Sequence, residues 1–309
     1  MSLARSALLW VSNNQALREA LPRYAFIRRA VKRFMPGEEL DDALGAAEEL
    51  RSKSIKAILT HLGENITQAE EAAHVRDHYI EALGRIGERG LDAYLSVKLT
   101  QLGLDLSEEF CLENIRSIIE RAAQVNNMVW IDMEQSHYVD RTLSVFRKAR
   151  EGAPNVGVCL QAYLYRTEKD LRDLLPLDPA IRLVKGAYAE PSSVAYPRKS
   201  DVDSNYANLT DILLENAVKR RTLAGIATHD PALIRRAGSR ASEMGLSKSA
   251  FEYQLLYGIR TEEQFRLAAE GYRVRSLISY GSFWFPWYVR RLAERPANVT
   301  FVLKSLLSK

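Results

Sequence analysis

Between residues 54 and 279 the sequence alternates eight times between a short apolar run and a longer amphipathic segment. Apolar runs of this length are typical of buried strands, and amphipathic segments are typical of the helices that cover them. We expect strands at residues 54–60, 93–100, 128–133, 156–161, 181–186, 223–229, 251–256 and 273–279. Strands that each lead into a helix through short links predict an α/β protein with the (βα)8 TIM barrel fold.

Several of the intervening helices begin at residues typical of helix N-caps. A short polar side chain satisfies a free backbone N–H at such a position, and a proline or an acidic or amide residue often follows it. We expect caps at Ser107, Thr167, Asp230 and Thr261.

Residues 1–50 lie outside this alternation and read as helices. One is expected to end near residue 35, before Pro36-Gly37, and another to run from Leu40 to Leu50. We therefore divide the chain into an N-terminal helical segment, 1–50, packed on a barrel formed by 51–309. The basic residues in this segment fit a solvated helix face, with a membrane-surface patch as the alternative. They are Arg28, Arg29, Lys32 and Arg33.

After the eighth predicted strand, residues 283–288 are rich in aromatic side chains, and Arg290 and Arg291 follow. This composition is unusual for a helix in the outer ring of a barrel. One interpretation is a last helix that lies over the carboxyl ends of the strands. The other is aromatic packing between the barrel and the N-terminal helices.

Composition narrows the classes of function. A net charge of +4 on 309 residues gives no reason to expect nucleic acid as a partner. The two cysteines, Cys111 and Cys159, form no CxxC pair, which fits a reducing compartment and argues against a thiolate zinc site. The sequence has no apolar run of about 18 residues and no recognisable secretion signal, so we expect a cytoplasmic protein. No glycine-rich dinucleotide motif of the Rossmann type is present.

Polar side chains collect at the predicted carboxyl ends of the strands, where barrel enzymes bind their ligands. The segment 181–188 is the clearest case, because Arg182 and Lys185 would be costly to bury without an anionic partner. The plainer alternative is that these two basic side chains reach solvent at the rim. The strand-end residues are Lys98, Thr100, Asp132, Glu134, Gln161, Tyr163, Tyr165, Arg166, Arg182, Lys185, Tyr188, Thr228, His229, Asp230, Gln254 and Tyr257. Together they predict an active site; we expect His74 and His78 to be surface residues, and we expect no metal site.

Seven motifs in the correct order resemble the monofunctional bacterial proline dehydrogenases. They are VKLTQLGLDL (97–106), IDME (131–134), LQAYLYRT (160–167), IRLVKGAY (181–188), ATHD (227–230), FEYQLLYG (251–258) and VRRLAERPAN (289–298). The resemblance implies an FAD-dependent enzyme that oxidises L-proline to Δ1-pyrroline-5-carboxylate and passes the electrons to a membrane quinone. It also implies a distorted (βα)8 barrel whose last helix sits above the strands, and peripheral association with the membrane that holds the quinone.

The resemblance also assigns roles to residues by motif position. Asp132 and Arg182 would be catalytic, with Arg182 beside N5 of the flavin. The substrate would contact Lys98, Leu256, Leu277, Arg290 and Arg291. FAD would contact Met133, Gln161, Arg182, Lys185, Gly186, Ala187, Tyr188, Thr228 and His229. These residue types suit the chemistry, because arginines hold a carboxylate well and hydride transfer then depends largely on positioning.

The sequence departs from the family pattern at Leu277, where a tyrosine is usual in the eighth strand. A flavin-binding barrel with an altered substrate is therefore an alternative, as is one that binds flavin without turnover. A further alternative is a Schiff-base lyase of the aldolase type that uses Lys185. The chain carries no second catalytic domain, so a separate pyrroline-5-carboxylate dehydrogenase is the expected partner for the product.

Overall fold

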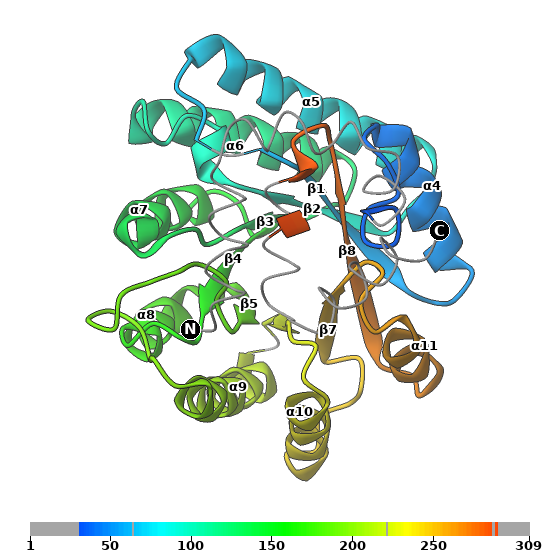
Figure 1. Ribbon diagram of the computed structural model, residues 1–309, viewed down its shortest axis with the longest axis vertical. Coiled ribbons are helices and arrows are strands. Elements are labelled where there is room, and N and C mark those ends of the chain that lie inside the picture. The colour runs from blue at the N-terminus through cyan, green and yellow to red at the C-terminus, as the bar shows by residue number, and fades with distance from the viewer. Residues whose placement is uncertain (1–30, 64, 221, 286–287, 290–309) are drawn as a thin grey trace, which may run out of the picture.

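The computed structural model describes residues 31–63, 65–220, 222–285 and 288–289, which form a closed barrel of eight parallel strands surrounded by helices (Figure 1). Each strand pairs with its neighbours in chain order, and β8 closes the barrel by pairing with β1 from Lys56–Arg275 to His61–Tyr280. The strands are β1 (Lys56–His61), β2 (Ala93–Val97), β3 (Val129–Ile131), β4 (Val156–Gln161), β5 (Ala180–Val184), β6 (Ala224–Ile226), β7 (Phe251–Leu256) and β8 (Arg273–Tyr280). All eight predicted strands and the predicted fold class are confirmed.

The helices follow the strands as expected. They are α4 (Leu40–Arg51), α5 (Ala69–Glu88), α6 (Glu108–Gln124), α7 (Val139–Arg150), α8 (Thr167–Leu174), α9 (Lys199–Arg220), α10 (Pro231–Glu243) and α11 (Thr261–Ala269). Short 3-10 helices occupy η2 (Leu99–Gln101), η3 (Ser136–Tyr138) and η4 (Leu175–Leu177). The strands β2, β3, β5 and β6 end two or three residues earlier than predicted, because the chain turns into loops directly at the pocket. After β2, η2 begins at Leu99.

Two of the four predicted helix caps are confirmed. The Ser107 side chain accepts a hydrogen bond from Phe110 N, and the Asp230 side chain accepts one from Ala232 N. The predictions for Thr167 and Thr261 are wrong by one residue, because each is the first residue of its helix. The Thr167 hydroxyl instead donates to the Gln161 carbonyl oxygen (2.5 Å), so it supports the end of β4.

The N-terminal segment meets the barrel through α4, which packs against β1 and β8. Trp284 Nε1 donates to Glu38 Oε1 (2.9 Å), and the Tyr288 ring lies 6.1 Å from the Phe34 ring. Trp284 and Tyr288 therefore pack on the N-terminal segment, as the second interpretation expected. Residues 1–30 and 290–309 lie outside the described residues, so the division at residue 50 and the last helix stay predictions.

A buried ion pair fills the barrel interior near the amino ends of the strands. Glu252 and Arg275 are 0% and 1% exposed in their side chains, with Arg275 Nε 3.0 Å from Glu252 Oε1. Arg275 also reaches Asp92 Oδ1 (2.7 Å) and stacks on the Tyr94 ring (3.4 Å). Because these large side chains are almost fully buried, they fill the interior at the amino ends of the strands, and the pocket opens at the carboxyl ends instead.

Candidate active site

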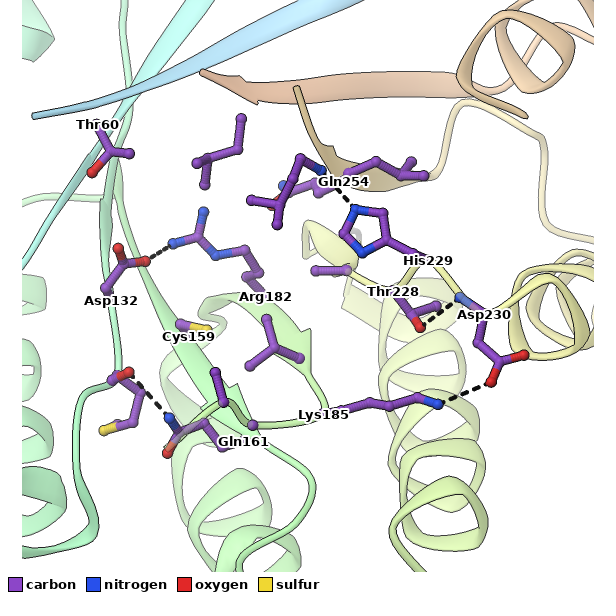
Figure 2. Close-up of a pocket in the computed structure, with 18 of the residues that line it drawn as sticks. Thr60, Asp132, Cys159, Gln161, Arg182, Lys185, Thr228, His229, Asp230 and Gln254 are labelled. Carbon is purple, nitrogen blue, oxygen red and sulfur yellow. Dashed lines mark hydrogen bonds and ion pairs between the residues drawn. The ribbon is translucent and has the colours of Figure 1, made fainter. Parts of the chain in front are cut away.

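A pocket of about 710 Å³ opens at the carboxyl ends of the strands (Figure 2). Its volume is in the range of small-molecule and cofactor sites. It is lined by the predicted site residues that fall in the described part of the chain: Lys98, Asp132, Met133, Gln161, Arg182, Lys185, Gly186, Ala187, Tyr188, Thr228, His229, Leu256 and Leu277. Arg290 and Arg291 lie outside the described residues.

Arg182 and Asp132 form the charged floor of the pocket. Arg182 is on β5 and its side chain is 3% exposed, while Asp132 follows β3. Arg182 Nη2 contacts Asp132 Oδ1, and it also donates to Ser96 Oγ (2.6 Å). Ser96 Oγ in turn donates to Asp132 Oδ1 (2.9 Å), and Lys98 Nζ lies 3.9 Å from Asp132 Oδ2. The carboxylate therefore has two cationic neighbours and one hydroxyl donor, and it lines the pocket.

Lys185 is held between two carboxylates on the opposite wall. Its Nζ lies 2.5 Å from Asp203 Oδ1, on α9, and 3.0 Å from Asp230 Oδ2. Burial raises the pKa of Asp230, but the hydrogen bond and charge of Lys185 outweigh burial and lower that pKa to about 2. The pKa of Asp203 is likewise lowered, by Lys185 and Lys199 against burial. Both carboxylates are thus ionised near neutral pH, and both contact the lysine Nζ.

Gly186 allows the chain after β5 to pass close to Tyr163, two residues after the end of β4. Its φ is +112°, and a Cβ there would lie 2.2 Å from the Tyr163 ring. Any other residue would be strained and would displace the ring. Below it, Gln161 Nε2 donates to the Met133 carbonyl oxygen (3.2 Å), while Gln161 Oε1 has no hydrogen-bond partner among the described residues. This wall therefore presents a hydrogen-bond acceptor without a partner, Gln161 Oε1, next to the backbone of Gly186.

Thr228 and His229 form the wall that follows β6. Leu256 N donates to His229 Nε2 (2.9 Å), so Nε2 carries no hydrogen and Nδ1 does. Thr228 Oγ1 accepts from Asp230 N (3.2 Å). The His229 ring is thus fixed in one tautomer by a backbone group of β7.

Sequence reasoning missed several residues of the pocket or its support: Ser96, Asp203, Thr60, Cys159, Lys199, Arg260 and Ser279. Ser96 stands two residues before Lys98 on β2, so the alternation of side chains along a strand was a usable signal. Asp203 lies on α9, 18 residues after Lys185, and no local sequence pattern predicts its contact with that lysine.

Some strand-end residues do not belong to the pocket. Glu134 accepts hydrogen bonds from Thr100 N (3.2 Å) and Oγ1 (2.7 Å) in a buried contact outside it. Arg166 pairs with the exposed Asp140 (2.5 Å) and the buried Asp170 (2.7 Å), outside the pocket. Tyr163, Tyr165 and Tyr257 are likewise absent from its lining.

The expectation for His74 is confirmed, because it is exposed, but the expectation for His78 is wrong. His78 is half-buried, its ring is 4.6 Å from the His61 ring, and Nε2 lies 2.9 Å from the Tyr280 hydroxyl. Tyr280 is the last residue of β8, and this packing could not be read from the helix alone. In the described part of the chain no group of three potential ligands is arranged to hold a metal ion.

Comparison with known proteins gives a consistent result. The family model described as proline dehydrogenase matches residues 43–304. Proline dehydrogenase 1 of Bacillus subtilis subsp. natto is 38% identical over 307 residues, covering 99% of this chain and all of the relative. The proline dehydrogenase of Deinococcus radiodurans is 38% identical over 310 residues, covering 99% of this chain and 98% of the relative.

The fold has a counterpart among solved structures. Proline utilization A (PutA) from Bdellovibrio bacteriovorus, inactivated by N-propargylglycine, superposes with a TM-score of 0.81 at 24% identity. The match covers 94% of this chain and 36% of that protein, so the chain spans about a third of its length. At this identity the likeness concerns the barrel fold.

Proposed function

The chain belongs to the proline dehydrogenase family and oxidises L-proline, and we propose that FAD is its resident cofactor, with Δ1-pyrroline-5-carboxylate as product and a membrane quinone as final acceptor. The observation that carries this proposal is the convergence of the family's motif residues on one pocket, from β2 round to β8. FAD, when bound, supplies the two-electron acceptor for the hydride that leaves the ring carbon beside the proline nitrogen.

The pocket residues fit such a cofactor. Gln161 Oε1 and Arg182 Nη1 are buried polar atoms without partners among the described residues, and buried polar groups normally have one. Gly186 lines the pocket, and its missing Cβ lets this part of the wall pack closely on the Tyr163 ring behind it. We assign the cofactor contacts to Met133, Gln161, Arg182, Lys185, Gly186, Ala187, Tyr188, Thr228 and His229.

Arg182 and Asp132 are the proposed catalytic residues. Arg182 is buried and permanently charged, so it stabilises negative charge that develops in the pocket during oxidation. The substrate amine must be neutral before a hydride can leave. Asp132, paired with Arg182 and close to Lys98, is the proposed group for that proton step.

The remaining contacts are assigned to the substrate. We propose that Lys98, Leu256 and Leu277 border the proline ring, and that Arg290 and Arg291 hold its carboxylate. Leu277 lines the pocket as an apolar side chain, which favours a second candidate function, in which the same barrel oxidises a ring-substituted proline analogue. A hydrophobic contact over the ring is retained there, whereas a tyrosine hydroxyl is not available.

The surroundings of Lys185 argue against a Schiff-base lyase. A Schiff-base lysine needs a free Nζ to attack a substrate carbonyl, and here Nζ is engaged by Asp203 (2.5 Å) and Asp230 (3.0 Å). The two mechanisms are separated by treating the purified protein with borohydride in the presence of substrate. A protein that is yellow before either reagent is added, and that then traps no substrate on Lys185, supports the flavoprotein. A protein that is colourless as purified and traps substrate contradicts it.

Two further partners belong to this proposal. The product is expected to pass to a separate pyrroline-5-carboxylate dehydrogenase, and quinone reduction calls for contact with a membrane surface from the cytoplasmic side.

No helix in the described ranges has the length and hydropathy to span a membrane. Of the aromatic residues after β8 that are described, Phe283 is 38% exposed, whereas Trp284, Phe285 and Tyr288 are buried. Phe283 and the exposed Lys32 and Arg33 are the proposed contacts.

A further inference from the structure

A carboxylate on the β5–α9 loop joins that loop to the β3–α7 loop. Glu190 Oε1 accepts a hydrogen bond from Ser136 N (2.7 Å), and Oε2 accepts one from Ser136 Oγ (2.5 Å). Both residues are half-buried. We call this contact the Glu190–Ser136 latch. The two loops follow β3 and β5, which are not paired with each other because β4 lies between them in the barrel. The contact is therefore additional to the hydrogen bonds of the sheet.

The latch ties together two segments that line the pocket. Ser136 follows Met133 by three residues, and Glu190 follows Tyr188 by two. Both Met133 and Tyr188 line the pocket, as does Gln161 at the end of the intervening strand. Since Gln161 Nε2 also donates to the Met133 carbonyl oxygen (3.2 Å), the latch closes a wall that runs from the β3–α7 loop past the end of β4 to the β5–α9 loop.

Other contacts hold the two ends of the β5–α9 loop on the β4–α8 loop. Tyr163 N donates to the Lys185 carbonyl oxygen (2.8 Å) at its beginning. Tyr165 N and Tyr196 N form further backbone hydrogen bonds near its far end. The latch secures the part between these ends, where the chain leaves the pocket after Tyr188.

We propose that Glu190 is a positioning residue that fixes the wall of the cofactor pocket before FAD binds. This inference rests on the proposed FAD site. A loop ordered in advance costs a ligand less conformational entropy on binding than a loop that must become ordered with it. Two hydrogen bonds to one carboxylate, one of them from a backbone N–H, define the separation of the two segments more closely than a single contact would.

The test compares the wild type with Glu190→Ala and Glu190→Gln, using the full chain stripped of flavin. FAD affinity is measured by fluorescence quenching, the bound flavin by visible circular dichroism, and the flavin-free protein by thermal unfolding. Glu190→Ala is expected to raise the Kd for FAD by about tenfold. Glu190→Gln should restore most of the affinity, because its amide can accept from Ser136 N and donate to Ser136 Oγ.

Tyr165→Phe is the matched control. It removes the hydrogen bond from Tyr165 Oη to the Ser192 carbonyl oxygen (3.0 Å) in the same loop, away from the pocket lining. It should leave the Kd for FAD unchanged. Ser136→Ala, which keeps the backbone half of the latch, should give an intermediate Kd and replaces Glu190→Ala if that variant does not fold.

The outcomes separate the two claims. A wild type that binds no FAD contradicts the proposed cofactor itself. A wild type that binds FAD, with Glu190→Ala or Ser136→Ala showing the same Kd and the same visible dichroism, overturns the role of Glu190. So does a Glu190→Ala variant whose only change is a lower unfolding temperature, because that result marks a structural contact.

Discussion

Arg182 on β5 and Asp132 at the end of β3 meet across the barrel interior, although their strands are not neighbours. Ser96 Oγ, from β2, stands between them, 2.6 Å from Arg182 Nη2 and 2.9 Å from Asp132 Oδ1. Three strands thus contribute one side chain each to a single hydrogen-bonded group. Since each side chain is fixed by the other two, the charge on the pocket floor is held in place before any ligand arrives.

Asp132→Asn tests this group. The variant keeps the shape of the side chain but leaves the buried Arg182 without a negative partner. We expect the free energy of unfolding to fall by about 3 kcal/mol and kcat/KM for proline to fall about 100-fold. Urea unfolding and steady-state kinetics with an artificial acceptor measure both. Asp140→Asn, at an exposed ion pair with Arg166, is the control, and equal kinetics for the two variants would exclude Asp132 from catalysis.

Lys185→Met tests whether the ion pairs of Lys185 with Asp203 and Asp230 stabilise the fold, through the pH dependence of stability. The pKa of Asp230 is about 2 in the folded protein against an ordinary 3.8, so its pairing stabilises the fold fully above pH 4. That contribution is lost as the pH falls from about 4 to about 2. The deficit in stability of the variant should therefore be large at pH 7 and shrink below pH 4, in urea unfolding of flavin-free protein. Lys169→Met, in a surface pair with Asp173, is the control. An equal deficit at pH 3 and pH 7 for Lys185→Met would show that the ion pairs contribute nothing.

Leu277→Tyr tests substrate choice. Leu277 lines the pocket, and a tyrosine there takes up more space and adds a hydroxyl. We expect the ratio of kcat/KM for proline to that for ring-substituted prolines to rise by about tenfold, since a filled pocket rejects the added group. Competition between the substrates in flavin reduction measures the ratio. A ratio equal to that of the wild type would mean that Leu277 does not face the ring.

Arg291→Ala tests the proposed carboxylate contact, which lies outside the described residues. Loss of a charge-assisted hydrogen bond worth roughly 1.5–3 kcal/mol predicts that the apparent KM for proline rises about tenfold or more, with flavin still bound. Initial rates and the flavin-to-protein absorbance ratio measure the two properties. An unchanged KM would place the carboxylate elsewhere.

The sequence predicted the barrel well because each strand is a short apolar run closed by polar residues, as in IRLVKG at 181–186. It predicted the pocket residues on strand ends for the same reason, since parallel strands bring their carboxyl ends together. The contacts that hold these residues were not predictable. Asp203 reaches Lys185 from α9, and Glu190 reaches Ser136 across an intervening strand, so both depend on the tertiary fold.

His78 illustrates the same limit. On a polar helix it reads as a surface residue, yet the packing of α5 on the barrel brings it against His61 and Tyr280. Burial, then the charges of His78 and Lys98, lower the pKa of His61 to about 4, so this ring is neutral at pH 7. The periodicity of a sequence predicts which residues share one face of a helix, but it does not predict which loop or strand end that face packs against.

Anaerobic titration of the purified protein with L-proline, followed by flavin absorbance, tests the central claim most directly. The visible absorbance band of the oxidised flavin is expected to fall in proportion to added proline and to return when a quinone analogue is added. A flavin-containing wild type whose spectrum is unchanged by proline and by its ring-substituted analogues would contradict the account.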